Sequence, residues 1–115
     1  MNKIIVYGIA NCDTIKKTLD WYKKNNISVE FHDYKKIGIS QIKLEEWCKQ
    51  VGWQALLNKK SNTWRALPVE IQEKTNDEAS AISTMRANTS LIKRPVIEIN
   101  NNTILVGAQS FENLK

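Results

Sequence analysis

The chain opens with a run of apolar, mostly β-branched residues, Ile4 to Tyr7, which predicts a short buried strand. Gly8 and Asn11 follow as turn residues and end this run. Apolar residues then recur at helical spacing over 15–22, with charged residues between them. Cys12 therefore stands between a tight loop and the start of a predicted helix.

Residues 27–34 alternate between apolar and polar and predict a second strand, followed by a loop over 35–38. A strand, a helix and a strand this close together predict parallel pairing through a right-handed crossover. A region rich in helical patterns comes next, interrupted by a polar loop over 58–63. The first predicted helix is 40–51, with Ser40 as its N-cap and Gly52 as the residue that ends it. A short apolar helix or turn over 53–57 and a helix over 68–72 follow. A last helix is capped by Thr75 or Asn76, with Ala79, Ile82, Met85 and Leu91 as its apolar positions.

Two further strands are predicted over 96–99 and 103–106, joined by a hairpin turn of three asparagines and followed by a short helix over 110–114. The order is strand, helix, strand, helical insert, strand, strand, helix. This is the layout of an α/β, thioredoxin-like (glutaredoxin-like) fold with a four-stranded mixed sheet and an inserted helical subdomain. We expect one domain over 1–115, with its core in 1–35 and 91–115 and the insertion in 40–90.

Composition narrows the functional classes. A chain of 115 residues with 42% hydrophobic residues suits one folded domain. Seventeen basic against twelve acidic residues give a net charge of +5, which suits nucleic acid or a small anionic substrate. The lysines are spread along the chain, and this disfavours a nucleic-acid interface. Two cysteines and one histidine supply no metal-ligand set. Without a membrane-spanning run or a signal peptide, we expect a cytoplasmic protein, and a monomer because no long apolar stripe is left over.

Cys12 is the candidate nucleophile. A free cysteine often packs as an inert apolar residue, but a polar turn followed by a helix start is a poor place to bury a side chain. The N–H groups and the dipole at a helix N-terminus favour the thiolate, which is the reactive form. Asp13 opposes this effect, and Lys16 and Lys17 offset Asp13. Cys48, by contrast, lies on an apolar helical stripe, and we expect it to be inert.

Three stretches resemble signatures of the YffB branch of the arsenate reductase (ArsC)-like family. They are the opening Tyr7-Gly8-Ile9, Asn11-Cys12-Asp13-Thr14, Lys16-Lys17 and Trp21, the middle Gly52-Trp53-Gln54-Ala55-Leu56-Leu57-Asn58 with Thr63-Trp64-Arg65, and the late Ile92-Lys93-Arg94-Pro95. The resemblance spans nearly the whole chain, and it implies a thioredoxin-like fold with a helical insertion.

The resemblance also implies site residues. Cys12 would be catalytic, with Asn11 beside it, and the Arg94–Pro95 bond would be cis and next to the cysteine. Arg94 would point toward Cys12 and hold a carboxylate or oxyanion by paired hydrogen bonds. Lys59 and Lys60 would form an anion-binding flap over Cys12, with Arg65 assisting as a further substrate-binding cation.

The branch is described as a glutathione-dependent thiol reductase. Ile15 stands where a CxxC motif would carry its second cysteine, so turnover by Cys12 needs an external thiol. We expect glutathione as that co-substrate, with no bound cofactor and no metal.

Two alternatives stay open. Arsenate reductases of this family bind arsenate through three arginines. Arg94 matches one of these. The second would fall near Asn58, so that arginine is missing and Arg65 is a candidate substitute, and the third would fall in 106–108, which carries no arginine. The Spx branch instead binds RNA polymerase as a regulator and usually carries a CxxC motif, against which Ile15 counts. A pull-down of polymerase would separate this binding role from the enzymatic ones.

Overall fold

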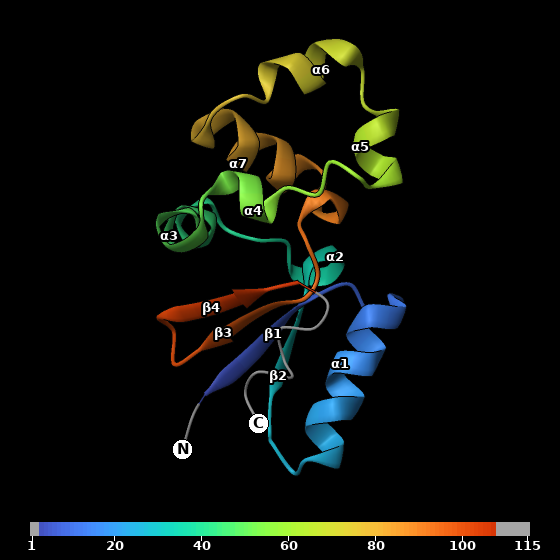
Figure 1. Ribbon diagram of the computed structural model, residues 1–115, viewed down its shortest axis with the longest axis vertical. Helices are drawn as coiled ribbons and strands as arrows, with labels where there is room; N and C mark the ends of the chain where they lie inside the picture. The colour runs from blue at the N-terminus through green and yellow to red at the C-terminus, as the bar shows by residue number, and fades with distance from the viewer. Residues whose placement is uncertain (1–2, 108–115) are drawn as a thin grey trace. The chain divides into compact units, whose positions relative to one another are not determined.

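A four-stranded sheet and a group of short helices form two separate units of the chain (Figure 1). The structure, a computed structural model, describes residues 3–107. The sheet unit joins the chain up to Ile37 with the part that begins at Arg94, and the helical unit runs from Gly38 to Lys93. Each unit is described by itself below.

The sheet has the order β2-β1-β3-β4. Its strands are β1 (Ile4–Gly8), β2 (Glu30–Asp33), β3 (Val96–Ile99) and β4 (Thr103–Val106). The pair β1–β2 is parallel, as predicted from the short strand–helix–strand unit, and the pairs β1–β3 and β3–β4 are antiparallel. The hairpin turns through Asn100 and Asn101, both in the left-handed region at φ 54° and 61°, a conformation that asparagine tolerates. The predicted mixed α/β sheet is confirmed.

Helix α1 (Asp13–Lys24) packs on one face of this sheet. Its core contacts are made by buried apolar residues, namely Ile4, Val6, Ile15, Tyr22 and Ile97. The helix ends at Lys24 with Asn25 as its C-cap, and Asn26 turns the chain back at φ 57°. Because strand side chains alternate, Tyr7 and Glu98 lie on the opposite face of the sheet.

The predicted second strand, 27–34, is too long. Only Glu30–Asp33 pairs with β1, although Ile27 and Val29 still pack against the core. Tyr34 begins a short helix instead, α2 (Tyr34–Ile37), where a loop was predicted. The reason is local, because the Asp33 carboxylate accepts a hydrogen bond from the Lys35 N–H at 2.9 Å and turns the chain out of the strand. The predicted helix 110–114 lies outside the described residues.

The helical unit contains α3 (Gln41–Val51), α4 (Trp53–Leu56), α5 (Asn62–Ala66), α6 (Val69–Lys74), α7 (Glu78–Ala87) and the 3₁₀ turn η1 (Thr89–Leu91). Helix α7 packs against α3, α4 and η1. Ser40 caps α3 as predicted by accepting the Lys43 N–H, and Gly52 at φ 82° ends it. No helix within residues 3–107 is long and apolar enough to cross a bilayer.

Three predictions for this unit were wrong. The polar loop stops before residue 63, since Ser61 accepts the Trp64 N–H and starts α5 at Asn62. The N-cap of α7 is Asp77, whose carboxylate accepts the Ser80 N–H at 2.8 Å. The predicted caps lie outside this helix, because Thr75 ends α6 and Asn76 follows it. The third wrong prediction concerns the apolar positions of α7. Ala79 is exposed and Ala81 is buried in its place, and Leu91 lies in η1, after α7 has ended at Ala87.

Candidate functional site

Cys12 is the N-cap residue of α1, as the sequence predicts. Its backbone is extended, its N–H donates to the Ile9 carbonyl at 3.2 Å, and its carbonyl accepts the Lys16 N–H at 3.0 Å. The thiol takes no part in capping and is half-buried at the margin of the core. The backbone is thus fixed on both sides of a sulfur that remains available for chemistry.

The loop that presents Cys12 depends on a close approach between Gly8 and Ile15. A Cβ atom added at Gly8 would overlap Cδ1 of Ile15 and lie 2.6 Å from its Cγ1. Ile15 is 1% exposed, so it cannot swing away into solvent. The place that a CxxC motif gives to its second thiol is therefore filled by a packed aliphatic side chain.

The sheet register gathers three segments at one end of the sheet. Tyr7 pairs with Val96 and Gly8 pairs with Asp33, so the loop to Cys12, the segment Arg94–Pro95 and the start of α2 all leave the sheet at this end. The Arg94–Pro95 bond is cis, as the resemblance implied. Pro95 is buried and its carbonyl accepts the Gly107 N–H at 3.1 Å, whereas Arg94 is half-buried and Asn11 is exposed.

An aromatic cluster that the sequence analysis missed lies near Arg94. The ring of Tyr7 is 4.7 Å from His32 and 6.2 Å from Tyr34 between centroids. Burial and the neighbouring Tyr7 raise the pKa of Tyr34 well above its usual value, and the Arg94 guanidinium opposes this. The Tyr34 ring is thus within the electrostatic reach of Arg94.

A buried carboxylate completes this face. Tyr7 donates its hydroxyl hydrogen to Oε1 of Glu98 at 3.1 Å, and Glu98 is only 1% exposed. The alternating pattern along β3 did not predict the burial of Glu98, because a glutamate between two isoleucines is typical of a solvent-facing position.

Lys59, Lys60 and Arg65 belong to the helical unit, and all three are exposed there. Lys59 and Lys60 line one open pocket together with Lys93, which the sequence analysis had not marked as a site residue. Arg65 lies on α5 and does not line this pocket. The approach of these cations to Cys12 stays a prediction.

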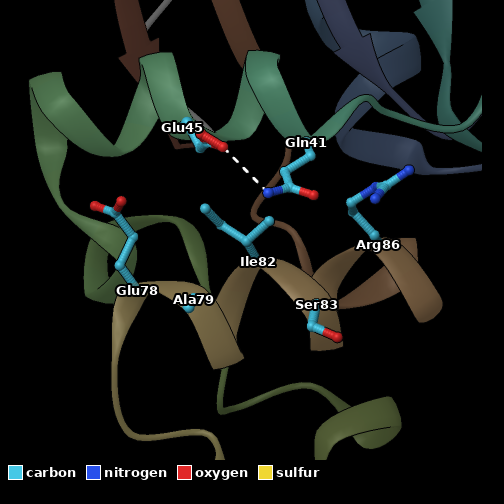
Figure 2. A pocket seen from close by; sticks show the side chains of 7 residues that line it. All are labelled: Gln41, Glu45, Glu78, Ala79, Ile82, Ser83 and Arg86. Atoms are coloured by element: carbon cyan, nitrogen blue, oxygen red, sulfur yellow. Dashed lines mark hydrogen bonds between the residues drawn. The ribbon is translucent and has the colours of Figure 1, made fainter.

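Cys48 is the other free thiol, and it is 6% exposed in the helical unit. Burial first, then Glu78 and Glu45, raise the pKa of Cys48 to about 11. These two carboxylates line a hollow of about 360 Å³ between α3 and α7, which also holds Arg86 (Figure 2). None of the predicted site residues lines it, and the predicted inert character of Cys48 agrees with this environment.

Comparison with known proteins identifies the family. The model of the ArsC family matches residues 7–114. The chain belongs to the ArsC family. An uncharacterized relative from Haemophilus influenzae is 41% identical over 104 residues, which cover 90% of each chain. Among solved structures, this ArsC-family chain is similar to the YffB protein at 41% identity and TM-score 0.86, covering 96% of this chain and 97% of that one.

A second solved relative is an arsenate reductase (ArsC) related protein from Brucella melitensis, 40% identical with TM-score 0.76, covering 98% of this chain and 95% of that one. An arsenate reductase from Vibrio cholerae shares the fold at TM-score 0.81 with 16% identity, covering 98% of each chain. The thioredoxin-like fold and the family resemblance predicted from the sequence are therefore confirmed. This ArsC-family chain is related to arsenate reductases, which are thiol-based oxidoreductases.

Proposed function

We propose that the protein is a glutathione-dependent thiol reductase that uses Cys12 as its single nucleophile. The observation that carries this is the pairing of an available, half-buried thiol at the start of α1 with a buried Ile15 in place of a second thiol. The other cysteine, Cys48, is buried and its pKa is raised to about 11, so it is a poor partner for exchange.

The chemistry has two exchange steps. The Cys12 thiolate attacks the glutathione sulfur of a mixed disulfide between glutathione and a substrate thiol. The substrate leaves as a thiolate, and Cys12 is left disulfide-bonded to glutathione. A second glutathione thiolate then attacks the glutathione sulfur of that adduct, which forms glutathione disulfide and returns the Cys12 thiolate. In the net reaction, one free glutathione thiol is consumed for each mixed disulfide, the substrate thiol is released, and the two glutathione molecules leave together as glutathione disulfide.

Glutathione carries two carboxylates, and the chain offers cations to hold them. Arg94, next to the buried Pro95 and at the same end of the sheet as Cys12, suits a carboxylate by paired hydrogen bonds. Asn11 is exposed beside the thiol and can donate from its amide. Lys59, Lys60 and Arg65 of the helical unit are further candidates for the second carboxylate.

The proposal is tested by trapping the adduct. Native protein is incubated with glutathione disulfide, and the intact mass and the modified peptide are measured. We expect one glutathionyl group on Cys12 in wild type and in Cys48→Ser, none in Cys12→Ser, and its removal by added glutathione. An adduct on Cys48, or none at all in Cys48→Ser, would overturn the proposal.

Arsenate reduction is the second candidate, because the relatives from Brucella melitensis and Vibrio cholerae are described in those terms. The chain keeps Arg94 but lacks the other two arginines of that pattern, with Asn58 and the segment 106–108 in their places. We expect turnover of a glutathione mixed disulfide to exceed glutathione-dependent reduction of arsenate. The reverse order of rates would place arsenate reduction first.

A further inference from the structure

A basic pocket lies in the helical unit, among residues that all fall within 38–93. It has a volume of about 440 Å³. Its lining residues are Gln54, Leu57, Asn58, Lys59, Lys60 and Lys93. Three of the six are lysines and none is acidic, so the pocket carries a concentrated positive charge.

Two distant segments are tied together to build the pocket. Leu57 and Ile92 form an antiparallel bridge. The Asn58 N–H donates to the Leu91 carbonyl at 2.7 Å, and the Lys93 N–H donates to the Leu56 carbonyl at 2.8 Å. Lys93 is therefore held next to a loop that precedes it by more than thirty residues.

The loop itself is fixed by its own polar groups. The Asn58 side chain accepts the Lys60 N–H at 3.1 Å, and the Asn58 carbonyl accepts the Ser61 hydroxyl at 2.9 Å. Ser61 in turn caps α5 through the Trp64 N–H. The backbone that carries Lys59 and Lys60 is thus defined without any ligand.

One of the lysines is also oriented. The ammonium of Lys59 lies 5.7 Å from the ring centroid of Trp53 and 5.4 Å from that of Trp64. Two aromatic faces attract the cation and restrict a side chain that would otherwise keep much rotamer freedom. The entropy lost when an anion binds this lysine is correspondingly smaller.

The three ammonium groups lack acidic partners. Within residues 3–107, none of the three pocket lysines takes part in an ion pair. Three like charges around one pocket repel each other, and a multiply charged anion relieves that repulsion. The amides of Gln54 and Asn58 add neutral donors, and Leu57 adds an apolar patch.

We propose that this pocket is a binding site for a small, multiply charged oxyanion, such as a phosphate or a group of carboxylates. Glutathione disulfide carries four carboxylates. With glutathione disulfide as its ligand, the site would serve the proposed reductase by selecting anionic thiol substrates. Inorganic phosphate would instead make it a site unconnected with thiol exchange. The inference itself does not depend on Cys12 chemistry.

The test uses Cys12→Ser protein, which removes thiol exchange and leaves the pocket intact. Backbone and indole N–H resonances are followed by NMR during titration with inorganic phosphate and, separately, with glutathione disulfide, at constant ionic strength set with chloride. We expect saturable shifts at Lys93, Lys60 and the Trp53 indole. Lys93→Gln and Lys60→Gln should each weaken binding by about tenfold, because each removes one charge-assisted hydrogen bond.

The matched control is Lys49→Gln, which removes the same charge from an exposed position on α3 in the same unit. It should leave the affinity unchanged. Saturation by phosphate identifies an inorganic oxyanion as the ligand type, and saturation by glutathione disulfide alone identifies carboxylates; both support the site. Linear, unsaturable shifts with both probes, or equal weakening by Lys49→Gln, overturn it. The adduct experiment above fails or succeeds independently, because it needs Cys12 and this titration does not.

Discussion

Replacing Gly8 by alanine probes the packing that presents Cys12. The backbone of Gly8 is not in the left-handed region, so alanine is not excluded by its φ angle. The obstacle is the Ile15 side chain, whose Cδ1 would overlap the new methyl group and whose Cγ1 would lie 2.6 Å from it. Ile15 is fully buried, and relief therefore requires movement of α1 or of the loop before Cys12.

The expected cost follows from overpacking. Inserting a methyl group into a filled core costs roughly 1–3 kcal/mol of unfolding free energy. Truncation of the clashing partner should remove that cost. Ile15→Ala alone destabilises by about 2–5 kcal/mol, but in its background Gly8→Ala should be neutral or stabilising by up to about 1 kcal/mol, because alanine restricts the unfolded chain. Ile15→Val, which removes one methyl group and costs only about 0.5–1.5 kcal/mol, should relieve part of the clash.

The assay is a double-mutant cycle in urea, followed by circular dichroism and by the alkylation rate of Cys12. We expect a coupling energy of about 1 kcal/mol or more between positions 8 and 15. The alkylation rate of Cys12 should differ from the wild-type rate only in the variants in which the clash remains. If Gly8→Ala costs the same in all three backgrounds, the Gly8–Ile15 contact does not set the loop, and the reasoning fails.

Three further predictions follow from single groups. Alkylation of Cys48 in native protein should rise about tenfold per pH unit up to its pKa of about 11, and a rate that is flat with pH would contradict this. Hydrogen bonds from Ser80 lower the pKa of Asp77. The contribution of Asp77 to stability is therefore complete above its unfolded-state pKa and is lost as the pH falls through its folded-state pKa. The difference in melting temperature between wild type and Asp77→Ala should close at low pH, and a difference that persists would refute this prediction. Tyr7→Phe removes a hydrogen-bond donor to the buried Glu98 and should lower the free energy of unfolding in urea by about 1–3 kcal/mol. Tyr34→Phe should lower it by less, because the buried Tyr34 hydroxyl has no hydrogen-bond partner among the described residues. Equal losses of stability in the two variants would contradict the Tyr7–Glu98 hydrogen bond.

Strong periodic patterns in the sequence predicted most of the helices and strands. Apolar β-branched runs located β1, β3 and β4, and Ser40 and Gly52 located both ends of α3. The sequence did not predict the ends of helices and strands that depend on a single side chain. Asp33 could equally have continued a strand or turned the chain, and only its bond to the Lys35 N–H favours the helix α2. The same competition between neighbouring polar residues placed the N-cap of α7 at Asp77.

The candidate site was only partly predictable. Cys12 could be placed because a strand, a turn and a helix start define a helix N-terminus from local sequence alone. Glu98 could not be found, because its burial depends on the other strands and on Tyr7, which is 91 positions away along the chain. Lys93 was missed for a similar reason, since the Leu57–Ile92 bridge that brings it to Lys59 and Lys60 is a tertiary contact.

The buried Ile15 makes a last prediction about the lifetime of the Cys12–glutathione adduct. An intramolecular thiol would resolve such an adduct within the molecule, but the residue one helical turn after Cys12 is aliphatic and the remaining thiol, Cys48, is 6% exposed with a pKa of about 11. Adduct separated from free thiol should therefore persist, and its decay should be the same in wild type and in Cys48→Ser. Added glutathione should release it in both at equal rates. If wild type loses the adduct faster than Cys48→Ser, the two cysteines exchange, and the single-cysteine mechanism is wrong.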